Sequence, residues 1–233
     1  MSRLRRHEDI GINAYLNFAL TLAKALMVLL LASFALMASN DQISDGIKPS
    51  AEYTIEMSWE DGSPHDIDLW MELPSKQLIY YQQKELSLAN LDRDDTGSNG
   101  NSILVDGKIY RSLLRKEIIA LRGIIPGEYV VNVMLFSFSG QDSRLTEKTR
   151  KSYQTGDDLP VEIPVLVEIK KLNPVTQIVF NSKVVIRKNR QEIHIVRFVL
   201  DKDGTVTNIT TNNPISLANK VVPGATLFEG RSR

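Results

Sequence analysis

Residues 53–72 read YTIEMSWEDGSPHDIDLWME, and this stretch decides the fold. Its first seven residues alternate between apolar and polar side chains, and residues 66–72 alternate again. A period of two places every second side chain on the same face of a β-strand. The second strand therefore has one apolar face, while its other face carries Asp66, Asp68 and Trp70. The residues between the two runs, DGSP, are typical turn formers.

Further strands follow at short intervals along the chain. Period-two or continuous apolar runs predict strands at 77–82, 116–122, 128–138, 161–171, 176–187, 191–200 and 205–209. Polar, Gly-rich or charged segments at 92–101 and 139–158 predict loops. Many short strands separated by turns are typical of a β-sandwich. We therefore expect a mainly β fold, with a β-sandwich over residues 52–210 and a C-terminal tail over 211–233.

The segment before this domain has a different character. Residues 14–38 include LNFALTLAKALMVLLLASFALMA and carry one charge, Lys24. As a helix, 25 such residues span roughly 37 Å, which exceeds a hydrocarbon core of about 30 Å. We expect a single transmembrane helix over residues 12–39, joined to the β domain by a polar linker over 40–51.

The flanking charges predict the orientation of this helix. Arg3, Arg5 and Arg6 precede it, whereas Lys48 is the nearest Lys or Arg after it. The positive-inside rule places such an N-terminus in the cytoplasm. We expect residues 1–11 to be cytoplasmic, the helix to cross the inner (cytoplasmic) membrane, and the β domain to be periplasmic or extracellular.

Two other interpretations of the N-terminal segment remain open. A signal peptide cleaved after Ala38 would release a secreted or virion-borne, adhesin-like module, although the apolar run is longer than the usual 7–15 residues. A buried helix of a soluble protein would show a polar face, and this segment is apolar on nearly every side.

A polar stripe runs along the predicted helix. Asn13, Asn17, Thr21 and Lys24 follow one another at helical spacing. Polar groups in a membrane helix usually face other helices, so the stripe predicts contact with a membrane-protein partner or with a second copy. Alternatively, Lys24 snorkels to the headgroups and the Asn residues lie in the interface.

Composition excludes several functional classes. Lys and Arg total 28, as do Asp and Glu, so the chain lacks the basic excess of a nucleic-acid-binding protein. It contains no cysteine, which excludes disulfides and thiolate chemistry. The three histidines lack zinc-site spacing, and neither a nucleophile elbow nor a phosphate-binding loop occurs. We therefore predict a protein that is not an enzyme.

Five aspartates are the candidate metal ligands: Asp66, Asp68, Asp92, Asp94 and Asp95. The first two share a strand face, and the polar loop could bring the others beside them. Calcium takes six to eight oxygen ligands, and unneutralised carboxylates would repel one another. Calcium is therefore the predicted cofactor, whereas the alternative is that these aspartates form turns and a solvated edge.

Four motifs in order resemble a group of known domains: DIDLW at 66–70, IYY at 79–81, LDRDD at 91–95 and PGEYVVNV at 126–133. Over roughly residues 53–140, the chain is similar to bacterial extracytoplasmic β-sandwich domains of the prepeptidase C-terminal-like type and to a related periplasmic family of unknown function. The resemblance implies a binding or accessory module whose acidic loops can hold calcium.

These observations predict a single-pass envelope protein of a bacterium or phage, whose β-sandwich binds or scaffolds without catalysis. The layout of short N-terminus, helix and outer domain is also similar to the accessory subunit of ion-driven, stator-like complexes. Those subunits carry a proton-conducting Asp early in the helix, where this chain has Asn17. The alternative is thus an accessory subunit of such a complex, with proton conduction in doubt.

Overall fold

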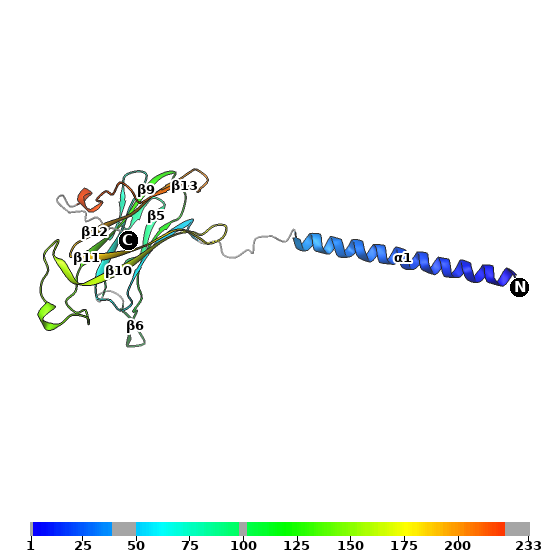
Figure 1. Cartoon of the computed structure of the whole chain (residues 1–233), viewed down its shortest axis with the longest axis horizontal. Coiled ribbons are helices and arrows are strands. Elements are labelled where there is room, and N and C mark those ends of the chain that lie inside the picture. The colour runs from blue at the N-terminus through cyan, green and yellow to red at the C-terminus, as the bar shows by residue number, and fades with distance from the viewer. Residues whose placement is uncertain (1, 39–49, 98–101, 222–233) are drawn as a thin grey trace. The chain divides into compact units, whose positions relative to one another are not determined.

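The computed structural model describes residues 2–38, 50–97 and 102–221. The chain divides into two units, residues 1–48 and 49–233, and each is described by itself. The first unit is one helix, α1 (Ser2–Ala38), so the predicted cytoplasmic residues 2–11 are helical as well (Figure 1).

Helix α1 is long and apolar enough to cross a membrane. Its stretch Tyr15–Ser33 has a mean hydropathy of 1.9, and none of it is buried against the rest of the protein. Two hydroxyl groups are satisfied within the helix, since Thr21 Oγ1 donates to the carbonyl of Asn17 at 2.7 Å and Ser33 Oγ donates to that of Leu30 at 2.8 Å. The side chain of Asn13 and linker residues 40–49 lie outside the described part.

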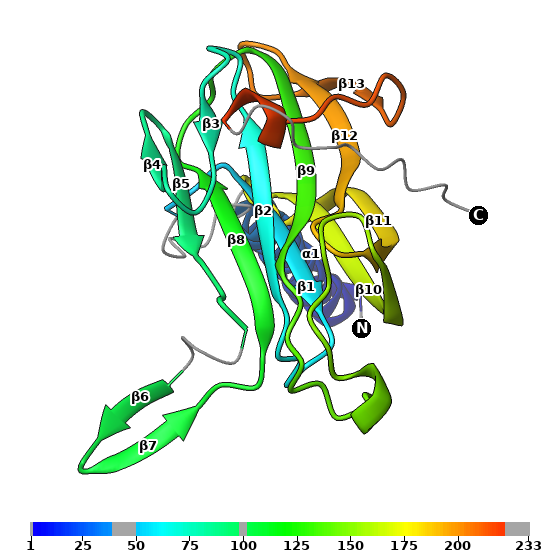
Figure 2. The ribbon, with the colours of Figure 1, turned by 90° about the vertical axis from the view of Figure 1, so that its left-hand side faces the viewer.

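The second unit is built from two antiparallel sheets and a separate hairpin (Figure 2). In the described residues, the first sheet has the order β11 (Gln177–Lys188), β10 (Asp158–Lys171), β1 (Tyr53–Trp59), β8 (Arg115–Leu121), β5 (Ala89–Arg93) and β4 (Glu85–Leu86). The second sheet has the order β13 (Val206–Thr210), β12 (Glu192–Leu200), β9 (Gly127–Ser137), β2 (Asp66–Glu72) and β3 (Leu78–Ile79). The hairpin consists of β6 (Ser102–Val105) and β7 (Lys108–Arg111).

The hydrophobic core lies between the two sheets. Alternate residues of β1, from Tyr53 to Trp59, are buried in it, and Ile67, Leu69 and Met71 of β2 face them from the opposite sheet. Tyr129 and Phe198 stack in the same core with ring centroids 4.9 Å apart. The alternation predicted from the sequence is therefore confirmed, and so is the mainly β, sandwich-type fold with one N-terminal apolar helix.

The C-terminal segment continues to pack beyond the last strand. Leu217 and Ala218 are buried against Trp70 and Val130 on the outer face of the second sheet. The carboxylate of Glu192 holds them there, because it accepts hydrogen bonds from the backbone N–H groups of both residues. The predicted tail, 211–233, thus includes a docked strap (residues 215–221), while 222–233 lie outside the described part.

The sequence pattern missed some strands. Strand β5 takes Asp92 and Arg93 out of the predicted loop, and the hairpin β6–β7 was not predicted at all. The hairpin turn at Asp106 and Gly107 has positive φ at both residues, 49° and 75°, as a type I′ turn requires. Its Asp-Gly dipeptide was the available signal.

Candidate metal site

Three carboxylates from both sheets meet at one side of the sandwich. Asp68 lies on β2, Asp94 directly follows β5, and Glu117 lies on β8. One oxygen from each lies within 4.8 Å of the other two. These three residues are called the acidic cluster below.

The strand arrangement explains how the cluster forms. β3 pairs only with Met71 and Glu72 of β2, so the first half of β2 has no strand neighbour on that side among the described residues. Glu117 fills this position, because its Oε2 accepts a hydrogen bond from the N–H of Leu69 at 2.7 Å. Its Oε1 accepts from the N–H of Asp95 at 3.2 Å. The Glu117 side chain thereby bridges the two sheets.

Several carboxylate oxygens near this point have no protein partner. In the described part of the chain, Asp66 Oδ1, Asp68 Oδ2 and Asp94 Oδ1 are buried without a hydrogen bond. Asp68 is only 3% exposed. The other oxygen of Asp94 accepts from Lys84 Nζ at 2.6 Å, and the charge of Arg190 also acts on Asp68. Buried carboxylate oxygens without partners are costly unless a cation balances them.

The pKa values of these carboxyl groups also show that negative charge is unfavourable at this site. Burial, and then the charge of Asp68, raises the pKa of Glu117 well above its ordinary value. Burial, followed by the charges of Asp66 and Asp94, does the same to the pKa of Asp68. Burial together with Asp94 and Asp95 raises the pKa of Asp66 to about 6. Without a bound metal ion, the carboxyl groups of this site are therefore protonated more readily than in an unfolded chain.

The structure separates the five predicted aspartates into three groups. Asp68 and Asp94 belong to the cluster, and Asp66 lies close enough to raise the pKa of Asp68. Asp95 has other partners, since its carboxylate accepts from the N–H groups of Gly97 and Lys116 and pairs with arginines. Asp92 forms a two-pronged ion pair with Arg122, at 2.8 and 2.9 Å.

Glu117 was missed by the sequence reasoning, although a signal existed. In β8 it alternates with Ile119 and Leu121, which are both fully buried. A carboxylate in the apolar register of a strand is a buried charge that requires a partner. That pattern, rather than the density of Asp in a loop, identifies the third ligand.

Gly97 follows Asp94 and Asp95 in the segment after β5. Its φ is +68°, and a Cβ at this position would lie 2.6 Å from the carbonyl oxygen of Pro64. Only glycine fits both the conformation and the space. The loop can therefore pack directly on the turn before β2, which brings Asp94 beside Asp68.

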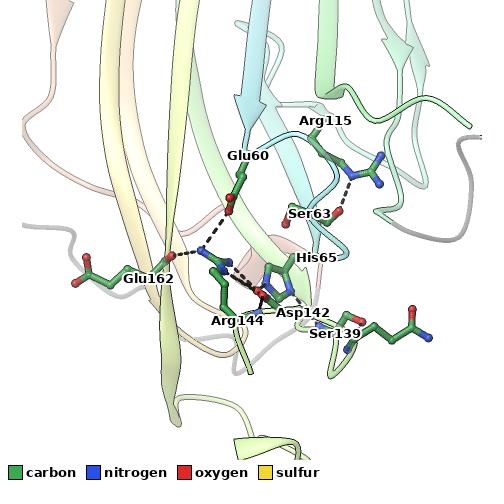
Figure 3. A network of polar contacts seen from close by, with 9 residues as sticks. Glu60, Ser63, His65, Arg115, Ser139, Asp142, Arg144 and Glu162 are labelled. Atoms are coloured by element: carbon green, nitrogen blue, oxygen red, sulfur yellow. Dashed lines mark hydrogen bonds and ion pairs between the residues drawn. The ribbon is translucent and has the colours of Figure 1, made fainter. Parts of the chain in front are cut away.

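A second polar network surrounds His65 (Figure 3). The N–H of Ser139 donates to His65 Nδ1 at 3.2 Å, so Nε2 carries the ring proton and donates to Asp142 Oδ2 at 2.8 Å. Arg144 holds the Asp142 carboxylate from the other side. Both ring nitrogens are used and the ring is fully buried. The network fixes the loop after β9 to the turn before β2, and it offers no free base.

Comparisons with known proteins give no relatives for this chain. No family model matches it, and neither a curated protein nor a solved structure matches.

Proposed function

We propose that this chain is a membrane-tethered, non-catalytic binding or scaffolding module whose acidic cluster holds calcium. The cation site is supported above all by the buried Oδ2 of Asp68, which accepts no hydrogen bond within the described part of the chain and lies among other carboxylates. A bound divalent cation would neutralise these charges and would be the partner of Asp68 Oδ2 and Asp94 Oδ1.

The donor set favours calcium over other metals. Asp68, Asp94 and Glu117 offer carboxylate oxygens, and Asp66 can add another. Calcium accepts six to eight oxygens in flexible geometry, whereas structural zinc prefers Cys and His ligands. His65, the nearest histidine in the sequence, uses both ring nitrogens elsewhere. Magnesium demands stricter octahedral geometry and retains several waters.

In this proposal, helix α1 anchors the β domain to a membrane. Exposed apolar residues from Tyr15 to Ser33, behind three arginines, support a single-pass helix in the cytoplasmic membrane with a cytoplasmic N-terminus. The β domain then lies in the periplasm or outside the cell. A partner membrane protein or a second copy would meet the polar stripe at Asn17 and Lys24.

Calcium binding is tested by thermal unfolding of the detergent-solubilised full chain. At a hundredfold excess over the dissociation constant, a ligand specific for the folded state adds about 2.7 kcal/mol. For a domain of this size, we expect Tm to rise by roughly 5–10 °C relative to chelator. Asp68→Asn and Glu117→Gln should lose most of this shift.

Asp92→Asn is the matched control. Asp92 lies at the end of β5, two residues before Asp94, and its carboxylate is paired with Arg122 on the surface. The variant should keep the full calcium shift. An unchanged Tm of the wild-type chain on adding calcium or on chelation would refute the cation site.

A further inference from the structure

Arg190 lies in the tight turn between β11 and β12, and this turn brings it to the start of β2. The next residue, Gln191, accepts a backbone hydrogen bond from β9 at 3.0 Å, which fixes the turn beside that strand. The guanidinium carbon of Arg190 lies 4.6 Å from the ring centroid of Phe136. Phe136 lies at the irregularity in the ladder between β9 and β2, next to the partner of Asp66. Arg190 is therefore held beside the strand that carries Asp66 and Asp68.

The Arg190 guanidinium acts on these carboxylates without touching them. Arg190 is partly buried, and in the described part of the chain its side chain forms no hydrogen bond or ion pair. Burial raises the pKa values of Asp66 and Asp68, and the charge of Arg190 acts in the opposite direction on both. The cation–π contact with Phe136 thus holds a positive charge near the acidic cluster and leaves the carboxylate oxygens open.

A fixed positive charge in this place has two consequences for the cluster. Without a metal ion, it partly balances the negative charge of the carboxylates. When a divalent ion binds, the same charge repels that ion, and a partly buried pair of charges is screened by salt less than an exposed pair. Arg190 and a metal ion therefore oppose each other, although both are attracted by the same carboxylates.

We propose that Arg190 is the internal counter-cation of the acidic cluster, which competes with calcium and sets the calcium affinity of this site. This inference rests on the proposed calcium function and adds the regulation of that site. A weakened site is filled or empty according to the calcium concentration around it, as in extracellular modules with dissociation constants of about 10⁻⁴–10⁻³ M. Because the coupling is reciprocal, bound calcium also weakens the attraction that holds Arg190 in place.

The first test compares calcium affinities of the detergent-solubilised full chain, titrated against a calcium-sensitive dye. Arg190→Gln removes the charge, so we expect the dissociation constant for calcium to fall roughly three- to tenfold. Arg190→Lys keeps the charge and should stay within about twofold of the wild type. Residue 190 has a φ of +60°, and Gln and Lys experience the same backbone strain there as Arg. The two variants therefore differ in charge and not in their effect on the turn.

Arg187→Gln is the matched control, because Arg187 belongs to the same hairpin but pairs on the surface with Glu162 at 2.7 Å. It should keep the calcium affinity of the wild type. A second measurement needs no calcium. In chelator, Arg190→Gln should have a lower Tm than Arg190→Lys, and this difference should largely disappear when Asp68→Asn is added to both.

Three outcomes would overturn the proposal. The first is a calcium affinity of Arg190→Gln that equals or falls below that of the wild type. The second is an undiminished Tm difference between the two variants after Asp68→Asn, which would show a role of Arg190 in the turn alone. The third is a wild-type chain that binds no calcium, which removes the proposed function as well. Calcium binding with an unchanged affinity in Arg190→Gln removes this inference and leaves the proposed function standing.

Discussion

Asp66 shows at the level of one residue how the acidic cluster couples to pH. It is partly buried at the start of β2, and burial together with Asp94 and Asp95 raises its pKa to about 6. The ordinary value is 3.8, so between these pH values the folded state holds a proton that the unfolded chain has released. Stability of the metal-free protein therefore falls as pH rises from about 4 to above 6.

We predict that Asp66→Asn removes this contribution. A shift of two units corresponds to an upper bound of about 3 kcal/mol between the two ends of the window, and solvent screening of the partly buried Asp66 reduces it to on the order of 1–2 kcal/mol. Chemical unfolding of the solubilised chain in chelator, from pH 4 to 7, should show a smaller loss of stability in the variant than in the wild type. Parallel pH profiles for the two proteins would contradict the prediction.

The same residues show what the sequence could predict about the site. Alternation in DIDLW predicts that Asp66 and Asp68 lie near each other, and in the structure the charge of Asp66 raises the pKa of Asp68. It could not select Asp94 over Asp92, because that choice depends on the end of β5 and on Arg122, which is distant in sequence. It also could not show that Glu117 replaces a missing strand neighbour of β2.

At the level of elements, buried carboxylates of the second sheet hold the strap at 215–221, with Glu192 bound to its backbone and Glu72 paired with Lys220. Glu192 is 1% exposed and accepts hydrogen bonds from Asn132, from the hydroxyl of Ser216, and from the backbone of Leu217 and Ala218. Hydrogen bonds to a charged group contribute about 1.5–3 kcal/mol each, and buried donors left without a partner carry a further cost.

We predict that Glu192→Ala destabilises the domain by roughly 3–5 kcal/mol and increases amide exchange in the strap. Its physical cause is the loss of one acceptor that serves several buried donors. Glu162→Ala is the control, since Glu162 is 64% exposed and pairs only on the surface with Arg187. Denaturant unfolding and hydrogen exchange measure the two effects. Equal stabilities of the two variants would show that the strap is held without Glu192, by its apolar contacts and by the pairing of Lys220 with Glu72.

Elements with a strong apolar period were predictable, and elements without one were not. The strands around Ile55, Leu69 and Val131 contribute to the core and therefore show the period in their sequence. The two-residue strand β4 buries no apolar side chain fully, so nothing in its composition distinguishes it from a loop. The strap docks through Leu217 and a distant Glu192, and no local pattern encodes that pairing.

For the whole molecule, the proposed membrane tether raises the question of what α1 would contact within a bilayer. In the predicted polar stripe, Thr21 donates its hydroxyl to the carbonyl of Asn17, so it needs no partner from another helix. The side-chain amide of Asn17 has two donors and an acceptor for which a partner helix would be the natural source in a lipid environment. The two positions therefore differ, although they belong to one stripe.

We predict that Asn17→Leu weakens association through the helix and that Thr21→Val does not. Hydrogen bonds between membrane helices contribute about 1 kcal/mol, so the cross-linked partner or dimer band in native membranes should fall roughly fivefold for Asn17→Leu. Alkaline carbonate washing provides the control, because both variants should remain in the membrane pellet if the helix spans. An unchanged band with Asn17→Leu would instead place this residue in the headgroup interface, where water satisfies its amide.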